Sequence, residues 1–326
     1  MQTTIKVKDL KVGMFVVLPV SWFKHPFFTN EFVIKSQDQI DKIIDYGIQE
    51  IIIDTSLGSP AVTGKLTQQD LVNTPPALWM PETLVPPDLR EAIHDKTMSP
   101  QKKSLIVYQS SRVLVERLFE DPKAENISEA KKGISEVVDL ILSDDATSKE
   151  LLKITSYDFY TYTHSVNVGV FSVMLAKALF RGSDGHDMHE LGAGFFLHDI
   201  GKVRIDPAII NKPGKVTDDE MAIIRTHPFQ GYKILKETNQ LTEECMVIVM
   251  QHHERENGSG YPRKLRKDEI HTYGRICCIA DVYDALTAER SYKKRIDTFP
   301  ALKLMKEQML DHFHQQIFEK FVLLFT

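Results

Sequence analysis

Residues 191–202 read LGAGFFLHDIGK, and this stretch decides how the rest of the chain is interpreted. Its first seven positions are apolar or small and predict a buried helix. His198 and Asp199 follow directly where that helix should end. An adjacent histidine and aspartate are a weak signal by themselves, because any buried helix end can carry such a pair. The meaning of the pair therefore depends on which other side chains the fold supplies.

The chain around this stretch is predominantly helical. From about residue 101 to the end, apolar residues recur with helical spacing. Thr217 and Glu220 form a capping box, which predicts that a helix starts there. Amphipathic patterns cover Leu105–Leu118, Ile134–Leu142, Val166–Phe180, Met221–Leu235, Met246–Met250 and Ile276–Leu286. We therefore predict a mainly α protein in which residues 101–326 form a helical region.

The N-terminal part has a different pattern. Residues 1–58 predict a small α/β domain, with a helix over Ser36–Tyr46 and short apolar runs that indicate strands at Ile5–Val7, Met14–Leu18, Phe32–Ile34 and Ile48–Ile53. Residues 59–100 hold seven of the fifteen prolines, a density that favours a linker.

Composition excludes several classes of protein. The net charge of −5 gives no global basic field, so we expect no binding to DNA or RNA polymers. A small anionic substrate would need local cations or metal ions. Three cysteines form neither a disulfide framework nor a zinc-finger spacing, which suits a reducing compartment. No apolar run is long enough for a membrane span, so we expect a soluble, cytoplasmic protein.

Histidines and carboxylates cluster in the helical region. A lone histidine on an apolar helix is usually a core or surface residue, and a lone Asp281 could be a carboxylate with hydrogen bonds in the core. The combination is more informative, because neutral imidazoles and carboxylates are ligands for divalent first-row metals. Their number is too large for one catalytic metal and suits two. The candidates within 85 residues are His198, Asp199, His227, His252, His253 and Asp281.

Five ordered motifs carry a resemblance to a known family. They are His198-Asp199-Ile200-Gly201-Lys202, Asn211-Lys212-Pro213-Gly214, His252-His253-Glu254, Gly260-Tyr261-Pro262 and Asp281-Val282-Tyr283-Asp284-Ala285-Leu286-Thr287. Over roughly residues 150–320 the chain resembles the HD-GYP family, a branch of the HD-domain metal-dependent phosphohydrolases with an all-helical catalytic domain. Residues 5–58 resemble more weakly an uncharacterised domain often found before HD-GYP domains.

The resemblance implies a metal centre. It adds His164 as the family's first HD-domain histidine, and it implies that Asp199 bridges two ions. One ion would be held by His164, His198, Asp199 and Asp281, and the other by Asp199, His227, His252 and His253. Some family members carry a glutamate for a third metal where this chain has Tyr160, so we expect two ions. Mixed imidazole and carboxylate ligation favours Fe or Mn.

The resemblance also implies how a substrate is bound. Asp199 and Lys202 would act in catalysis, and Lys202 would also reach a phosphate oxygen. Arg290 and Lys293 fall where the family places cations that hold the substrate's phosphates, and Tyr261 would help to shape the pocket. Asn257 stands where an aspartate is usual, which keeps the tight turn possible but removes a charge.

The expected enzyme is a phosphodiesterase that linearises a cyclic dinucleotide, cyclic di-GMP or 3',3'-cyclic GMP-AMP, with a hydroxide activated by the two metals. Two alternatives remain. The chain could be a receptor that binds the nucleotide without turnover, or a hydrolase of a mononucleotide or (p)ppGpp. The N-terminal domain is a candidate sensor, homodimerisation unit or docking site for a signalling partner.

Overall fold

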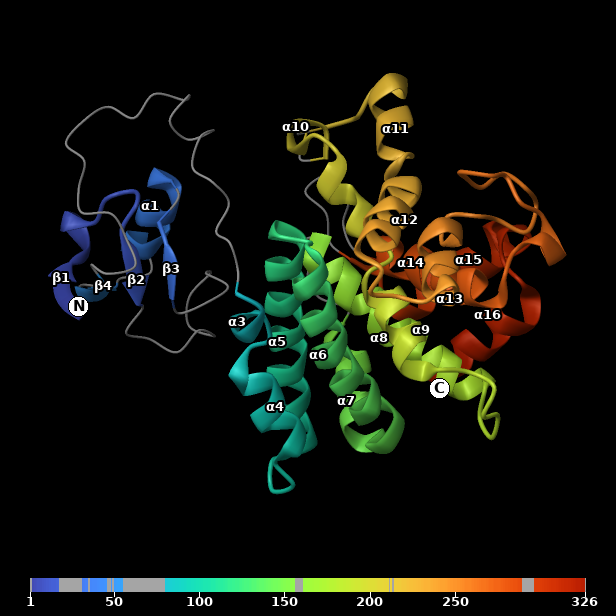
Figure 1. The fold of residues 1–326 in the computed structure, drawn as a ribbon, viewed down its shortest axis with the longest axis horizontal. Helices are drawn as coiled ribbons and strands as arrows, with labels where there is room; N and C mark the ends of the chain where they lie inside the picture. The colour runs from blue at the N-terminus through green and yellow to red at the C-terminus, as the bar shows by residue number, and fades with distance from the viewer. Residues whose placement is uncertain are drawn as a thin grey trace. The chain divides into compact units, whose positions relative to one another are not determined.

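The computed structural model describes residues 2–17, 31–34, 36–45, 48, 50–54, 80–155, 161–210, 212, 214–288 and 296–325. It divides the chain into two compact units, Met1–Thr74 and Pro75–Thr326. Figure 1 shows a small sheet in the first unit and helices throughout the second. The predicted fold class, mainly α with a small α/β N-terminal domain, is confirmed.

The described residues of the first unit form a four-stranded antiparallel sheet, a nine-residue α-helix and a short 3-10 helix. The elements are β1 (Gln2–Lys6), η1 (Val7–Asp9), β2 (Phe15–Val17), β3 (Glu31–Val33), α1 (Gln37–Asp45) and β4 (Glu50–Asp54). The strand order is β1-β4-β2-β3, and Val16 pairs with Ile53 in the centre. Ile40 and Ile43 of α1 are buried in one core with Val16 and Ile51. The alternating apolar pattern of the strands and the helical spacing in α1 therefore meet in this core.

The second unit is built from helices. They are α3 (Pro81–Leu84), α4 (Pro87–His94), α5 (Pro100–Glu120), α6 (Ala124–Ser143), α7 (Asp145–Ile154), α8 (Thr161–Leu179), α9 (Met188–Phe196), η3 (Ile200–Arg204), α10 (Pro207–Ile210), α11 (Asp218–Ile224), α12 (His227–Thr238), α13 (Glu243–Gln251), η4 (Lys267–Glu269), α14 (Thr272–Thr287), α15 (Thr298–Gln308), η5 (Leu310–His312), α16 (Gln315–Val322) and η6 (Leu323–Phe325). The capping box predicted at Thr217 and Glu220 is present at the start of α11.

Three prolines start helices in the segment where the composition predicts a linker. Pro81, Pro87 and Pro100 are the first residues of α3, α4 and α5. The first turn of a helix leaves its N–H groups without helical partners, so a proline costs nothing there. Leu84 and Leu89 are fully buried in the core of the second unit. Residues 81–100 therefore belong to the helical unit, although proline content alone indicated a break in structure.

The helices that carry the candidate site pack closely together. α8 contacts α5, α9 and α14, and α13 contacts α9, α12 and α14. Phe171 of α8, Tyr283 of α14 and Phe321 of α16 meet edge to face, with ring centroids 5.1–6.1 Å apart. This aromatic group fixes α14 against α8, so Asp281 and His164 are held in a defined relation.

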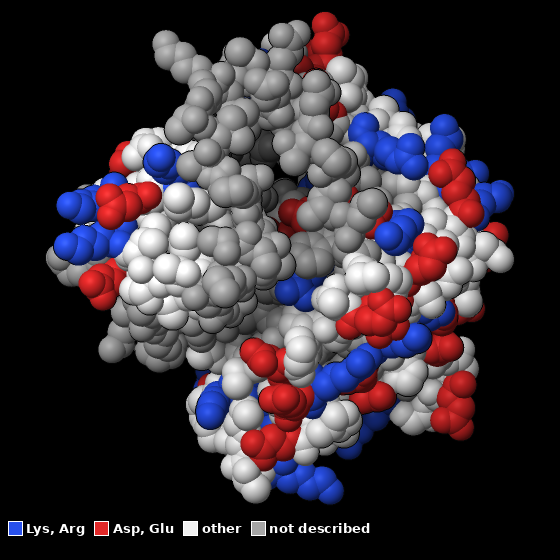
Figure 2. All heavy atoms as spheres, turned by 60° about the vertical axis from the view of Figure 1, so that its left-hand side comes forward, with Lys and Arg blue, Asp and Glu red and all other residues white. Residues whose placement is uncertain are grey.

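The described residues on one face of the molecule carry charges of both signs. On the face shown in Figure 2, Lys and Arg side chains are interspersed with Asp and Glu over the described residues. That part of the face therefore presents no continuous positive field of the kind that binds nucleic-acid polymers. Among the described helices, none combines the length and the apolar character required to cross a bilayer.

A close backbone approach joins two parts of the candidate site. A Cβ atom on Gly201 would lie 1.9 Å from the carbonyl oxygen of His227 and 2.4 Å from the amide nitrogen of Gly231. Only glycine permits this approach, because backbone atoms cannot move aside as a flexible side chain can. The contact between η3 and α12 thus places Asp199 beside His227.

We expect Gly201→Ala to lower the free energy of unfolding by at least about 2 kcal/mol, since the added methyl group has to displace backbone. Urea and thermal unfolding measure this change. Gly185→Ala is the matched control, because its nearest contact would be a serine hydroxyl at 3.6 Å. Equal stabilities of the two variants would contradict the assigned packing.

Candidate metal centre

The seven predicted ligands come from five places in the fold and meet in the interior of the second unit. They are His164 in the first turn of α8, His198 and Asp199 between α9 and η3, His227 at the start of α12, His252 and His253 after α13, and Asp281 in α14. His198, Asp199 and His252 are fully buried, and His253 is the most accessible of the described ligands. Five of the seven lie directly at or beyond a helix end.

Three of the histidines are held by the same local hydrogen bond. The Nδ1 atoms of His198, His227 and His252 lie 2.9, 2.8 and 2.8 Å from the carbonyl oxygen three residues earlier in the chain. These carbonyls belong to the last turns of α9, α11 and α13, where helical N–H partners run out. Because Nδ1–H donates to a carbonyl, Nε2 is left with a lone pair. Helix termination therefore sets the tautomer that a metal requires.

The sequence Thr226-His227-Pro228 shows this effect clearly. The carbonyl oxygen of Ile224 would accept a helical bond from the residue four positions later, which is Pro228. Proline has no N–H to donate. His227 Nδ1 donates to the Ile224 carbonyl oxygen instead, at 2.8 Å. This hydrogen bond orients the ring so that Nε2 faces Asp199.

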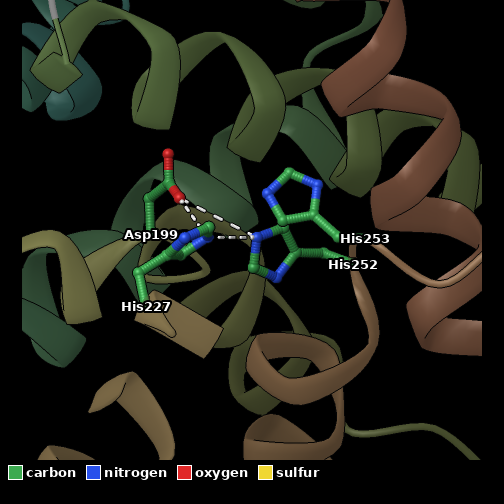
Figure 3. A group of neighbouring side chains, drawn as sticks. All are labelled: Asp199, His227, His252 and His253. Carbon is green, nitrogen blue, oxygen red and sulfur yellow. Dashed lines mark hydrogen bonds and ion pairs between the residues drawn. The ribbon is translucent and has the colours of Figure 1, made fainter. Parts of the chain in front are cut away.

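Figure 3 shows the first group of ligands, Asp199, His227, His252 and His253. Asp199 Oδ1 lies 3.1 Å from His227 Nε2 and 3.8 Å from His252 Nε2. The two Nε2 atoms lie 3.1 Å apart. With both Nδ1 atoms committed to carbonyls, two nitrogen lone pairs and a carboxylate oxygen face one another. A divalent cation between these three atoms would satisfy all of them at once.

The second group consists of His164, His198 and Asp281. His164 Nε2 lies 3.4 Å from His198 Nε2 and 3.3 Å from Asp281 Oδ1. Asp281 Oδ2 lies 3.2 Å from Nδ1 of His253, which belongs to the first group. Asp199 Oδ2 lies 3.4 Å from His164 Nε2. The two groups thus adjoin, and Asp199 faces both with its two oxygens.

Burial of the two carboxylates is offset by nearby positive charge and imidazoles. Burial acts to raise the pKa of Asp199, but Lys202 and the surrounding histidines outweigh it and hold that pKa well below the usual value. Burial likewise opposes ionisation of Asp281, while His253 and His164 hold its pKa well below the usual value. Both groups are therefore carboxylates, the form that binds a metal.

Burial has the opposite consequence for most of the imidazoles. It lowers the pKa of His198 and of His253 to about 4, and it lowers the pKa of His252 well below the usual value. Repulsion from neighbouring histidines adds to this effect for His252. These side chains are therefore neutral near pH 7. Ionised carboxylates with neutral imidazoles form a donor set that fits divalent metal ions.

His164 is oriented by partners that the motif analysis did not identify. Its Nδ1 lies 2.7 Å from Asp284 Oδ2, and Asn167 donates to Asp284 Oδ1 at 2.7 Å. Burial acts to lower the pKa of His164, but its hydrogen bonds to Asp281 and Asp284 outweigh burial and raise it to about 9. The position of Asp284 one turn after Asp281 was a signal for this role, because both then share one face of α14.

The predicted substrate residues are described only in part. Lys202 Nζ donates to Asp199 Oδ2. The Tyr261 ring lies 4.6 Å from the His253 ring, centroid to centroid. Arg290 and Lys293, like Tyr160, lie outside the described residues.

Arg225 is a further cation at the site that the sequence motifs did not indicate. Its guanidinium carbon lies 5.5 Å from the centroid of the Tyr261 ring. Among the described residues, no carboxylate lies within ion-pair distance of Arg225. It stands two residues before His227 in an exposed turn, so its charge alone gave no reason to select it among the forty lysines and arginines.

Buried Glu254 holds the loop that carries Tyr261. Its carboxylate accepts from the backbone N–H groups of Arg263 and Leu265 at 2.7 and 2.9 Å. Asn257 Oδ1 accepts from the Ser259 N–H at 2.9 Å, and Gly258 has φ +78°. The tight turn that Asn257 was expected to allow is therefore present.

Two family models match the chain. The model described as HD domain matches residues 154–317, and the model described as Domain of unknown function (DUF3391) matches residues 2–141. The second match extends beyond the sheet of the first unit and includes α5 and most of α6.

Similar proteins agree with these matches. A cyclic di-GMP phosphodiesterase of Pseudomonas aeruginosa is 31% identical over 323 residues, which are 98% of this chain and 75% of that protein. The 3'3'-cGAMP-specific phosphodiesterase 2 of Vibrio cholerae is 37% identical over 164 residues, 48% of this chain and 31% of that protein. The solved structure of an HDG"Y"P protein from Bdellovibrio bacteriovorus shares the fold, with a TM-score of 0.64 over 100% of this chain and 99% of that chain at 18% identity.

We expect His252→Ala to lose bound metal, weakening affinity by more than about 10-fold, because it removes a buried donor from the group around Asp199. Metal content after gel filtration, measured by mass spectrometry, tests this expectation. His189→Ala is the control, since His189 lies on the surface and pairs with Asp139 at 2.7 Å. Unchanged metal content in His252→Ala would contradict the assignment.

Proposed function

Because this chain belongs to the HD-GYP branch of the HD-domain family, we propose that it is a metal-dependent phosphodiesterase that opens a cyclic dinucleotide to a linear one. The substrate class is cyclic di-GMP or 3',3'-cyclic GMP-AMP, which the names of the relatives from Pseudomonas aeruginosa and Vibrio cholerae include. Two adjoining groups of histidines and carboxylates support the proposal most directly, with Asp199 in one group and 3.4 Å from His164 of the other.

The seven ligands would hold two divalent ions, Fe or Mn. One ion would be bound by His164, His198, Asp199 and Asp281, and the other by Asp199, His227, His252 and His253. When bound, such ions supply an activated water nucleophile and stabilise charge on phosphoryl oxygens. Neutral imidazoles and ionised carboxylates supply the donors without thiolates, which suits Fe or Mn better than softer ions.

Lys202 is placed to act between Asp199 and a phosphate. Its ammonium group donates to Asp199 Oδ2, while 23% of its side chain remains exposed. A cation at this boundary can compensate the buried carboxylate and also donate to a phosphate oxygen on the accessible side. Lys202 thereby orients the phosphodiester and stabilises the charge that develops as water adds and the bond to the leaving oxygen breaks.

Tyr261 and Arg225 would bind the nucleotide beside the ligands. Burial raises the pKa of Tyr261, so its phenol remains a hydrogen-bond donor. The aromatic ring borders His253, and the guanidinium of Arg225 lies over that ring. A planar base can stack on such a pair, and the guanidinium can donate to a base edge or phosphate.

We expect His198→Ala and Asp199→Ala each to reduce linearisation by more than about 100-fold, since each removes a metal ligand. Chromatography of products from cyclic di-GMP, 3',3'-cyclic GMP-AMP and (p)ppGpp, with protein of measured metal content, tests this. His189→Ala should retain activity. Tight binding without product in metal-replete protein would instead identify a receptor, and turnover of (p)ppGpp alone would identify another hydrolase.

We expect Arg225→Ala to raise KM for the cyclic dinucleotide by about 2- to 30-fold, because the nucleotide would lose a contact with the guanidinium worth about 0.5–2 kcal/mol. Metal content should stay unchanged, because Arg225 is not among the ligands. Arg181→Ala, which removes an exposed guanidinium near Asp145, is the matched control. Equal KM values for both variants would remove Arg225 from the substrate site.

A further inference from the structure

A chain of buried hydrogen bonds leads away from His164. Asp284 Oδ2 accepts from His164 Nδ1 at 2.7 Å, and Asn167 Nδ2 donates to Asp284 Oδ1 at 2.7 Å. The Tyr108 hydroxyl donates to Asn167 Oδ1 at 2.8 Å. All four side chains are buried, with Asn167 and Asp284 fully so. This series of hydrogen bonds therefore runs through the core from Tyr108 of α5 to Asn167 of α8, then to Asp284 of α14 and back to His164 of α8.

Each hydrogen bond in this series has a defined donor and acceptor. Asn167 presents its NH₂ group to Asp284 Oδ1, and the other carboxylate oxygen of Asp284 contacts His164. The amide oxygen of Asn167 then faces Tyr108, whose hydroxyl has to donate. With Tyr108 in place, every polar group from α5 to the His164 ring has a partner, and His164 Nε2 faces His198 and Asp281.

Tyr108 lies outside the part of the chain that matches the HD domain. That match covers residues 154–317, whereas Tyr108 falls in the match to a domain of unknown function over residues 2–141. α5 nevertheless packs on α8, and its Val107, Leu114 and Val115 are buried in the same core as the catalytic helices. The segment that matches the domain of unknown function thus contributes Tyr108 to the hydrogen bonds that lead to His164.

We propose that Tyr108 is a positioning residue of the metal centre, which acts through Asn167 and Asp284 to hold His164 in the orientation that binds metal. The inference rests on the proposed function, because it assumes that His164 is a ligand. It assigns a role to α5, which lies in the segment matched by the domain of unknown function: α5 would help to orient a metal ligand that lies in the HD domain.

The test is Mn²⁺ binding by the full chain, measured by electron paramagnetic resonance of free Mn²⁺. Loss of a residue that orients a ligand typically weakens metal affinity by about 10- to 100-fold. Because Tyr108 acts through two intervening side chains, we expect Tyr108→Phe to weaken one binding step by about 10-fold or somewhat less. Ser111→Ala is the matched control, since this buried hydroxyl lies one turn further along α5 and makes no hydrogen bond in the described structure.

A double-mutant cycle separates positioning from general packing. If Tyr108 acts through Asp284, Tyr108→Phe should cause no further loss of Mn²⁺ affinity in an Asp284→Asn background. A packing defect would instead weaken affinity equally in both backgrounds, and that result would overturn the inference. Unfolding curves of the metal-free variants verify that each one folds.

The outcomes also separate this inference from the proposed function. If the wild-type protein binds Mn²⁺ and Tyr108→Phe matches Ser111→Ala in affinity, the role of Tyr108 is refuted while the proposed function stands. If the wild-type protein binds no Mn²⁺, the proposed metal centre fails and the role of Tyr108 fails with it.

Discussion

The buried carboxylate of Asp199 is the constraint on which the rest of the site depends. An ionised carboxylate without solvent is costly, and it persists only where positive charge or donors compensate it. Here the close neighbours of one oxygen are imidazole lone pairs, fixed by backbone carbonyls at the ends of α11 and α13. Lys202 compensates the other oxygen. Asp199 Oδ1 has no hydrogen-bond donor among the described residues, and a bound cation would compensate its charge.

The ends of helices orient the imidazole rings of this site. A helix leaves its last carbonyls without partners, and a histidine placed just beyond the end can satisfy one of them with Nδ1–H. The remaining nitrogen is then aimed into the space where several helices converge. Because α9, α11 and α13 each end beside that space, three rings are oriented without any dedicated loop. The close approach at Gly201 brings two of these ends together.

Helical periodicity predicted the fold class, and short motifs selected His198, Asp199 and the other candidate ligands, because both are local signals. His164 was added only by the resemblance to the HD-GYP family. The structure brings the side chains of all seven residues close together. The sequence did not predict what depends on distant contacts. Proline content suggested a linker, but whether Pro81 and Pro87 break structure or start helices depends on the core into which Leu84 and Leu89 pack. The roles of Asn167 and Arg225 likewise follow from neighbours 117 and 36 positions away, Asp284 and Tyr261.

A second polar link shows how strongly the segment before the HD domain is tied to the ligand-bearing helices. Lys131 of α6 pairs with buried Glu190 in the first turn of α9, and the other oxygen of Glu190 accepts from the Thr242 N–H at 3.2 Å, at the start of α13. α9 and α13 run from this junction to His198 and His252. The ion pair and the hydrogen bond at the starts of these two helices fix the helices relative to each other. They thereby also fix the positions of His198 and His252 at the opposite ends. α5 and α6 are therefore both tied to elements that carry candidate ligands, α5 through the hydrogen bonds of Tyr108, Asn167 and Asp284, and α6 through the ion pair at the start of α9.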